Sequence, residues 1–183
     1  MKKIWNWFLY PPTDGPAAIL ILRLMTGAVF LWEGIMKFVY PNLGVGRFTK
    51  LAIPFPIFSA NFVACLEIVG GACLILGLLT RVFSVLFIIE MAVAMLTTKI
   101  SLFLGHYPLA LAPSPPTVGF WAVLHEIRSE YAQMLTSIFY CIVGPGVWSL
   151  DARLQRGRTP QQTISPPRRR PITNAPESHP PAL

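Results

Sequence analysis

The fold is decided by residues 16–39, PAAILILRLMTGAVFLWEGIMKFV, a stretch long and apolar enough to cross a bilayer that nevertheless contains three charges. These charges are Arg23, Glu33 and Lys37. A charged side chain in the hydrocarbon costs at least about 2.5 kcal/mol on insertion scales, so each of the three needs a partner from elsewhere in the chain. The stretch therefore predicts a transmembrane helix that depends on other helices.

The polar side chains of this segment gather on one side of the expected helix. At 100° per residue, the following positions fall within roughly 40° of one line: Arg23, Gly27, Phe30, Gly34 and Lys37. Glu33 lies at the edge of that line. The opposite side suits lipid and consists of Ile19, Leu22, Met25, Val29, Trp32 and Met36. Because glycines let a second helix approach closely, we expect the polar side to face protein and the other side to face lipid.

The composition of the whole chain is that of a membrane protein. Of its 183 residues, 54% are hydrophobic and 13% are charged, with a mean hydropathy of +0.55. A soluble domain carries about 25% charged residues, so a soluble enzyme core is excluded. Further apolar segments predict helices at about residues 59–79, 82–104 and 120–143. The expected fold class is all-α, a bundle of four transmembrane helices.

Positive charges are divided unevenly between the two ends of this bundle. One end would hold Lys2, Lys3, Arg81, Arg153, Arg156, Arg158, Arg168, Arg169 and Arg170, and the other would hold Arg47 and Lys50. Because cytoplasmic segments are rich in Lys and Arg, this asymmetry predicts that both termini are cytoplasmic. The chain divides into an interfacial lead (1–15), a transmembrane domain (16–151) and a basic, proline-rich tail (152–183) that we expect to be disordered.

Each predicted helix brings a carboxylate to the middle or the outer half of the membrane, where basic side chains nearly balance the charge. This candidate polar cluster consists of Glu33, Lys37, Glu67, Glu90, Lys99, Glu126, Arg128 and Glu130. We expect it to line a cavity that opens to the outside and is closed below by the apolar helix ends. Two roles remain open for the cluster: ion pairs that fix the helix register, and a ligand or proton site.

Smaller features point to structural roles. Arg23 is placed to act as a clamp, on Asp151 or on the carbonyls before Pro145, because helix-end carbonyls attract a cation. The three cysteines form no Cys-x-x-Cys motif and are interpreted as packing residues: Cys65, Cys73 and Cys141. His106 and His125 do not form a helical histidine pair, and we expect no metal site.

Four motifs follow one another along the chain: LRLMTGAVFLWEGIMKF (22–38), CLEIVGGACLILGLLTR (65–81), EMAVAMLTTK (90–99) and GPGVWSLD (144–151). Together they resemble the DoxX family of small integral membrane proteins over about residues 19–154. The resemblance implies a four-helix, multi-pass protein of a bacterial inner (cytoplasmic) membrane. The structural positions that it carries over are Arg23, Gly27, Gly34, Lys37, Glu67, Gly70, Gly71, Thr80, Arg81, Gly144, Pro145, Gly146, Ser149 and Asp151.

The resemblance implies a function only in outline. The family is named after a subunit of a thiosulfate-to-quinone oxidoreductase, and some relatives associate with redox partners. Three readings remain open: the membrane subunit of a quinone-linked redox system, a scaffold or assembly chaperone that binds membrane proteins through its glycine-lined faces, and a small transporter or lipid-binding protein.

The expected ligands and partners follow from these readings. The chain has no nucleotide-binding fingerprint, so we expect no intrinsic cofactor, with quinone as the candidate ligand. Any enzymatic role would then be that of a non-autonomous subunit. Expected partners are membrane lipid, a redox partner or other membrane protein, and a second copy of the chain; nucleic acid is not expected.

Overall fold

The structure is a computed structural model that describes residues 2–105, 109 and 116–157. This part of the chain contains helices and no strands, which confirms the all-α class for it. Its elements, in order, are α1 (Lys2–Leu9), α2 (Ile19–Val39), α3 (Val45–Lys50), α4 (Pro56–Leu76), α5 (Thr80–Thr98), the 3-10 helix η1 (Ile100–Leu104), α6 (Phe120–Glu126), α7 (Arg128–Val143) and α8 (Leu150–Arg156).

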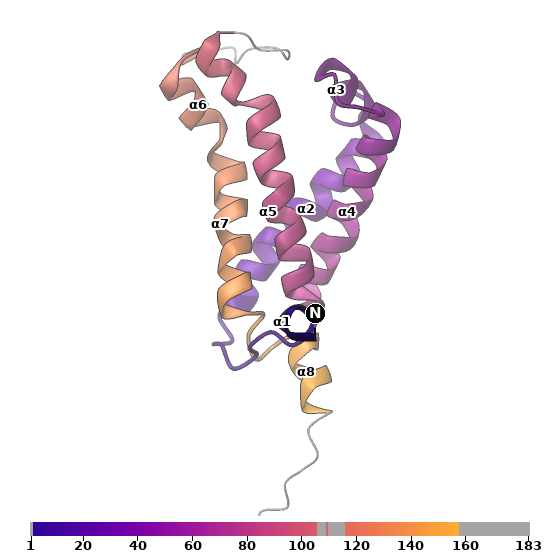
Figure 1. Cartoon of the computed structure of the whole chain (residues 1–183), viewed down its shortest axis with the longest axis vertical. Helices are drawn as coiled ribbons and strands as arrows, with labels where there is room; N and C mark the ends of the chain where they lie inside the picture. The colour runs from indigo at the N-terminus through magenta and orange to yellow at the C-terminus, as the bar shows by residue number, and fades with distance from the viewer. Residues whose placement is uncertain (1, 106–108, 110–115, 158–183) are drawn as a thin grey trace, which may run out of the picture.

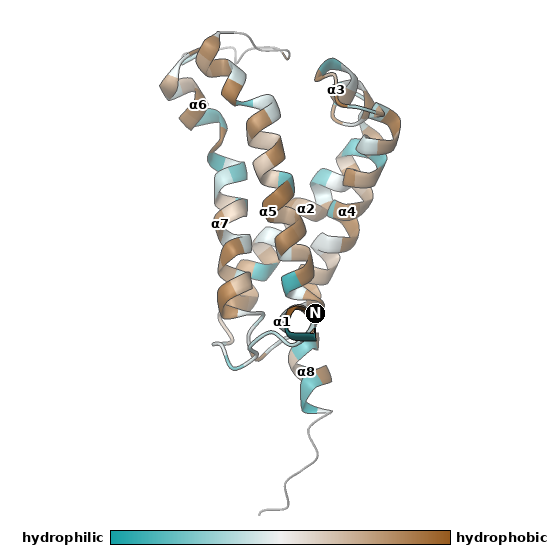
Figure 2. Cartoon of the chain, viewed as in Figure 1, coloured by the Kyte–Doolittle hydropathy of each residue, from teal (hydrophilic) through white to brown (hydrophobic). Residues whose placement is uncertain are grey.

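The long helices form two antiparallel pairs, because α2 packs along α4 and α5 packs along α7. Figure 1 shows that the two pairs meet near α1 and α8 and diverge toward α3 and α6. We call these two ends of the molecule the α1 end and the α6 end. The long helices are mostly hydrophobic, with isolated hydrophilic turns (Figure 2).

Within the described residues, three helical segments are long and apolar enough to cross a membrane: Ile19–Val39, Pro56–Leu76 and Thr80–Leu104. The fourth predicted helix, at about 120–143, is not continuous. The helix is divided into α6 and α7 at Ile127. At this break the Arg128 guanidinium donates to the His125 carbonyl, 2.5 Å away.

The side of α2 that was predicted to face protein is buried, at Arg23, Gly27, Phe30 and Gly34. The prediction that Ile19 faces lipid is wrong, since this side chain is 3% exposed. The chain after α7 returns against the start of α2, where the Val147 N–H donates to the Gly15 carbonyl at 3.1 Å. Ile19 is covered by this return and belongs to the hydrophobic core.

Arg23 joins three segments at the α1 end. Its Nη1 donates to the carbonyls of Pro145 (2.9 Å) and Trp148 (2.8 Å). Its Nη2 donates to the carbonyl of Ile75, near the end of α4, at 2.9 Å. Because Arg23 is 2% exposed, these bonds lie away from solvent and tie α2 to the end of α4 and to the segment before α8.

Asp151 does not pair with Arg23; it caps the start of α5 instead. Its carboxylate accepts from the N–H groups of Leu79 (2.9 Å) and Thr80 (3.1 Å) and from the Thr80 hydroxyl (3.0 Å). A carboxylate at a helix N-terminus satisfies free N–H groups and interacts favourably with the helix dipole. Arg23 and Asp151 therefore form two separate hydrogen-bonded groups, Arg23 with backbone carbonyls and Asp151 with the first residues of α5.

Arg81 forms a third link at the α1 end. Its Nε donates to the Cys141 carbonyl and its Nη1 donates to the Trp7 carbonyl, each at 2.9 Å. Its guanidinium also lies 4.5 Å from the centre of the Trp7 ring, within cation–π range. Arg81 therefore holds the exposed helix α1 against α5 and α7.

The tail begins later than the sequence predicted. The Ser149 hydroxyl accepts from the Ala152 N–H at 3.1 Å and caps α8. Residues 152–156, which were assigned to the disordered tail, are helical because of this cap. Residues 158–183 lie outside the described part of the chain.

Candidate functional site

The predicted polar cluster is divided between two places. One group lies between the helix pairs and contains Lys37, Glu67 and Glu90, which we call the central triad, with Glu33 near it. The other lies near the α6 end and contains Lys99, Glu126 and Glu130. Arg128 belongs to neither group, since its side chain is exposed and bonds to the His125 carbonyl. A single cluster of eight side chains is therefore not what the structure contains.

The central triad combines a cation with two carboxyl groups. Lys37 on α2 donates to Glu67 on α4 at 2.5 Å, and the Glu67 side chain is 4% exposed. Glu90 on α5 lies near Glu67, close enough for the two carboxyl groups to interact. Because two neighbouring carboxylates repel each other, a site of this kind favours a proton on one of them.

One atom of the triad has no protein partner. The Oε2 of Glu90 is buried and makes no hydrogen bond within the part of the chain that the structure describes. A buried polar atom without a partner is costly in a low-dielectric interior. Such an atom is a candidate contact for a ligand.

Glycines bring the three helices close enough for the triad to form. A Cβ on Gly34 would lie 2.7 Å from the Ala64 carbonyl oxygen, so α2 and α4 touch through their backbones one turn from Lys37. A Cβ on Gly70 would lie 2.6 Å from the Phe87 ring. Small residues at these contacts are typical of membrane helix packing. The motif glycines thus serve the packing of this chain's own helices against one another.

Two aromatic rings form the floor beneath the triad. Phe30 of α2 and Phe87 of α5 stack with their centroids 3.6 Å apart and their planes within 3°. Both rings are buried; Phe87 lies one helical turn from Glu90, and Phe30 lies two turns from Lys37. The polar groups therefore end in an apolar layer toward the α1 end.

Near the α6 end, the second group is more exposed. Lys99 Nζ lies 3.1 Å from Glu126 and 3.6 Å from Glu130, and the Glu126 side chain is 30% exposed. A partly solvated pair of this kind contributes little to stability. We interpret this group as a link between the end of α5 and the helices α6 and α7.

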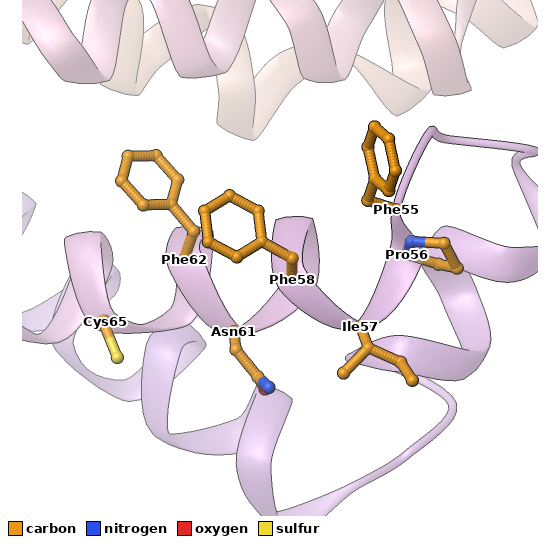
Figure 3. Close-up of a pocket in the computed structure, with 7 residues that line it drawn as sticks. All are labelled: Phe55, Pro56, Ile57, Phe58, Asn61, Phe62 and Cys65. Carbon is orange, nitrogen blue, oxygen red and sulfur yellow. The ribbon is translucent and has the colours of Figure 1, made fainter.

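An open groove of about 710 Å³ runs along the first turns of α4. It is lined by Phe55, Pro56, Ile57, Phe58, Asn61, Phe62 and Cys65. Figure 3 shows the rings of Phe55, Phe58 and Phe62 pointing toward the ribbons of the other helix pair. The groove is apolar apart from the Asn61 amide and suits a hydrocarbon chain rather than a polar substrate.

The sequence analysis missed part of this site. The Phe30–Phe87 stack joins two helices distant in sequence, and no local pattern predicts such a pair. Ser137 on α7 is fully buried at the helix interior. A signal for it existed, because Ser137 follows Glu130 and Gln133 at spacings of seven and four residues, on one helix face.

In the described part of the chain, no group of three or more His, Cys, Asp or Glu side chains is placed to hold a metal ion. His125 is exposed at the end of α6. His106 lies outside the described residues.

The Lys37–Glu67 ion pair gives a direct stability prediction. Glu67→Gln is expected to lower the free energy of unfolding by about 3 kcal/mol, because it leaves a lysine in the membrane interior without a counter-charge. Lys37→Met, combined with Glu67→Gln, should cost less than the two single changes added together. Denaturant titration of the purified protein in detergent measures each value.

The partly exposed carboxylate of Glu126 serves as the control for this prediction. Glu126→Gln should change the unfolding free energy by no more than about 1 kcal/mol, because its side chain is 30% exposed and Lys99 keeps Glu130 as a second partner. Additive effects at Lys37 and Glu67 would show that the two side chains are not energetically coupled.

Comparison with known proteins places the chain. The sequence model of the DoxX family matches residues 18–100, which include α2, α4 and α5. An uncharacterized membrane protein of Mycobacterium tuberculosis, Rv3486, is 42% identical over 157 residues, with 84% of this chain and 91% of that protein covered. The chain belongs to the DoxX family. It is an integral membrane protein, as the three apolar helices and its relatives agree.

Two further relatives carry informative names. The Bacillus subtilis protein "Putative oxidoreductase CatD" is 28% identical over 139 residues, covering 76% of this chain and 88% of that protein. The Escherichia coli inner membrane protein YphA is 26% identical over 141 residues, covering 75% of this chain and 91% of that protein. No solved structure matches the chain.

Proposed function

We propose that this DoxX-family protein is the membrane subunit of a quinone-linked redox system, with the quinone headgroup bound at the central triad. The observation that carries the proposal is the combination of Lys37, Glu67 and Glu90 directly above the Phe30–Phe87 stack. A quinone headgroup needs an apolar boundary for its ring and one or two donors for its carbonyl oxygens. The buried Phe30–Phe87 layer is the apolar boundary, and Lys37 and, when it carries a proton, Glu90 are the donors.

The chemistry assigns a separate role to each component. Reduction of a quinone to a quinol takes two electrons and two protons. In this proposal the electrons come from a redox partner protein, and the protons pass through the neighbouring carboxyl groups of Glu67 and Glu90. Lys37 stabilises the negative charge that develops on the quinone oxygen as electrons arrive. The chain is thus a non-autonomous part of an oxidoreductase.

The apolar groove on α4 gives the proposed ligand a place for its tail. The exposed rings of Phe55, Phe58 and Phe62 point toward the other helix pair, and the groove that they line reaches Cys65, two residues before Glu67. An isoprenoid chain can lie against such rings while its headgroup reaches the triad. The oxidoreductase name of the Bacillus subtilis relative supports this redox assignment.

The same proposal includes a location and a topology. We place the protein in the bacterial inner membrane, in agreement with the name of the Escherichia coli relative. We take α7 as a fourth crossing segment, which gives both termini a cytoplasmic position. The placement of α1 and α8 at one end of the molecule supports an even number of crossings (Figure 1).

Quinone retention tests the proposed function. The purified protein in nanodiscs containing ubiquinone or menaquinone is washed and analysed by native mass spectrometry. Wild-type protein should retain one quinone, whereas Lys37→Met and Glu67→Gln should lose it. Lys50→Met, a matched lysine change on exposed α3, should retain it. Equal retention by all variants, or none by the wild type, would contradict the proposal.

The structure does not expose the glycine-lined surface that a scaffold protein was expected to use. The glycines that were expected to contact partner proteins are buried against the chain's own helices, as Gly27 against Gly71 and Gly34 against Ala64. A scaffold would have to use another face. A stably bound protein without quinone in the same mass spectrum would favour it, and flux of a solute through proteoliposomes would favour a transporter.

A further inference from the structure

The face of α7 that turns toward the protein interior carries a line of polar side chains. Glu130, Gln133, Ser137 and Tyr140 fall within roughly 80° of the helix circumference. They extend over about 15 Å along the helix axis. Their exposure falls along this line, from 17% for the Glu130 side chain to 8% for Gln133 and 0% for Ser137 and Tyr140.

Two members of this line are buried without partners. Gln133 Oε1 and Ser137 Oγ make no hydrogen bond within the described ranges of the chain. Other hydroxyls in these helices behave differently: Ser84, Thr98 and Thr136 each donate to the carbonyl four residues earlier, at 2.6–2.8 Å. Ser137 does not take this local solution, so its hydroxyl remains available to another group.

The unpartnered atoms lie at one depth in the membrane. α5 and α7 are joined near the α6 end by Lys99 and Glu130 and near the α1 end by Arg81 and the Cys141 carbonyl. Glu90 is midway between the two α5 residues. Gln133 and Ser137 lie between the two α7 contacts, so they stand at about the level of Glu90. Three buried polar atoms without partners therefore lie at a similar depth, one on α5 and two on α7.

Below this level the interior is closed. Phe30, Phe87 and Tyr140 are all buried, and the Tyr140 hydroxyl bonds to Thr26 at 3.3 Å. Toward the α6 end the line continues instead through Glu130 to the partly exposed Glu126. A polar path that is open at one end and blocked at the other is suited to delivering protons to an interior site.

We propose that this face of α7 is a hydrated proton route from the α6 end to the central triad. Water molecules satisfy Gln133 and Ser137 and form the chain along which a proton passes between Glu130 and the level of Glu90. The purpose of the route rests on the proposed function, because quinone reduction consumes protons at the triad. Its hydration is a separate property that needs no quinone.

Thiol labelling tests the route. In a background with Cys65, Cys73 and Cys141 replaced by alanine, Ser137→Cys is exposed to the charged reagent MTSET in quinone-free nanodiscs. Because only the hydrated thiolate reacts, labelling should be at least about tenfold faster than at Leu135→Cys, a control on the exposed apolar side of the same helix. Ser129→Cys, exposed at the start of α7, gives the upper limit.

A second variant tests the direction of entry. Adding Gln133→Leu to Ser137→Cys should slow labelling toward the Leu135→Cys rate, since it removes the polar group between Ser137 and the α6 end. Labelling of Ser137→Cys no faster than Leu135→Cys would overturn the proposal, as would a rate unaffected by Gln133→Leu. Should Ser137→Cys fail to fold by size-exclusion chromatography, Gln133→Cys replaces it with the same expected result. Labelling without quinone retention would reject the proposed function alone.

Discussion

Arg23→Met is expected to lower the free energy of unfolding by at least about 3 kcal/mol, which is a large part of the stability of a small domain. The substitution keeps the length and apolar stem of the side chain and removes only the guanidinium. Three carbonyls then lose their donor, those of Pro145, Trp148 and Ile75. Each unsatisfied buried group costs about 1–3 kcal/mol.

The effect should extend beyond stability, because Arg23 links the two helix pairs where they meet. Its carbonyl partners belong to α4 and to the segment between α7 and α8. Without this link, the orientation of one helix pair relative to the other is less restricted, and Glu67 on α4 is less firmly held against Glu90 on α5. We therefore expect Arg23→Met to reduce quinone retention as well.

The measurement is denaturant unfolding in detergent, followed by circular dichroism. Arg153→Met is the matched control, since Arg153 lies exposed on α8, and its removal should change stability by less than about 0.5 kcal/mol. Arg23→Lys should fall between the two, because a single ammonium cannot reproduce the planar geometry that reaches three carbonyls. Equal stability of Arg23→Met and Arg153→Met would show that the three hydrogen bonds contribute nothing.

The sequence predicted most of what local periodicity determines. The polar side of α2 and the motif glycines at close contacts both follow from the spacing of residues along single helices. The position of Arg23 near helix-end carbonyls also follows, because depth along a transmembrane helix is proportional to residue number. Each of these features depends on a single helix and can be predicted without knowing which other helices pack against it.

The pairing of charges could not be predicted in the same way. Depth alone placed Lys37, Lys99 and Arg128 together, since all were expected in the outer half of the membrane. The two helix pairs diverge toward the α6 end, however, so Lys37 and Lys99 belong to separate groups (Figure 1). Divergence depends on how α2 and α5 meet at the Phe30–Phe87 stack, which is a contact between distant parts of the sequence.

The break at Ile127 shows a second limit. A polar half-turn in an apolar segment predicts exposure, but it does not predict where the backbone ladder is interrupted. At that point the Arg128 side chain folds back to the His125 carbonyl, and a rotamer of this kind is not encoded by periodicity. The burial of Ile19 likewise depends on a return of the chain more than 120 residues later.

Gly71→Ala is expected to destabilise the protein by about 3 kcal/mol, the upper end of the usual cost of overpacking. A Cβ at this position would lie 2.6 Å from the Gly27 carbonyl oxygen and 2.7 Å from the Leu31 backbone nitrogen. Both atoms belong to the backbone of α2, which cannot rotate away as a side chain can. The two helices must therefore move apart along their contact and lose dispersion energy over several turns.

Thermal unfolding in detergent compares this variant with Gly157→Ala. A Cβ at Gly157 would meet its nearest atom at 3.7 Å, an ordinary contact, so this control should leave stability nearly unchanged. If Gly71→Ala is equally harmless, then the close approach of α2 and α4 is not a source of stability.

Gly71→Ala also tests whether quinone binding depends on the spacing of α2 and α4, because it leaves the side chains of the central triad unchanged. Lys37 and Glu67 lie on the two helices that Gly71→Ala pushes apart, and their 2.5 Å contact must lengthen when the helices separate. Quinone retention should therefore fall in Gly71→Ala although every triad residue is still present. Retention at the wild-type level in a variant that is destabilised by about 3 kcal/mol would mean that the ligand does not depend on the spacing of α2 and α4.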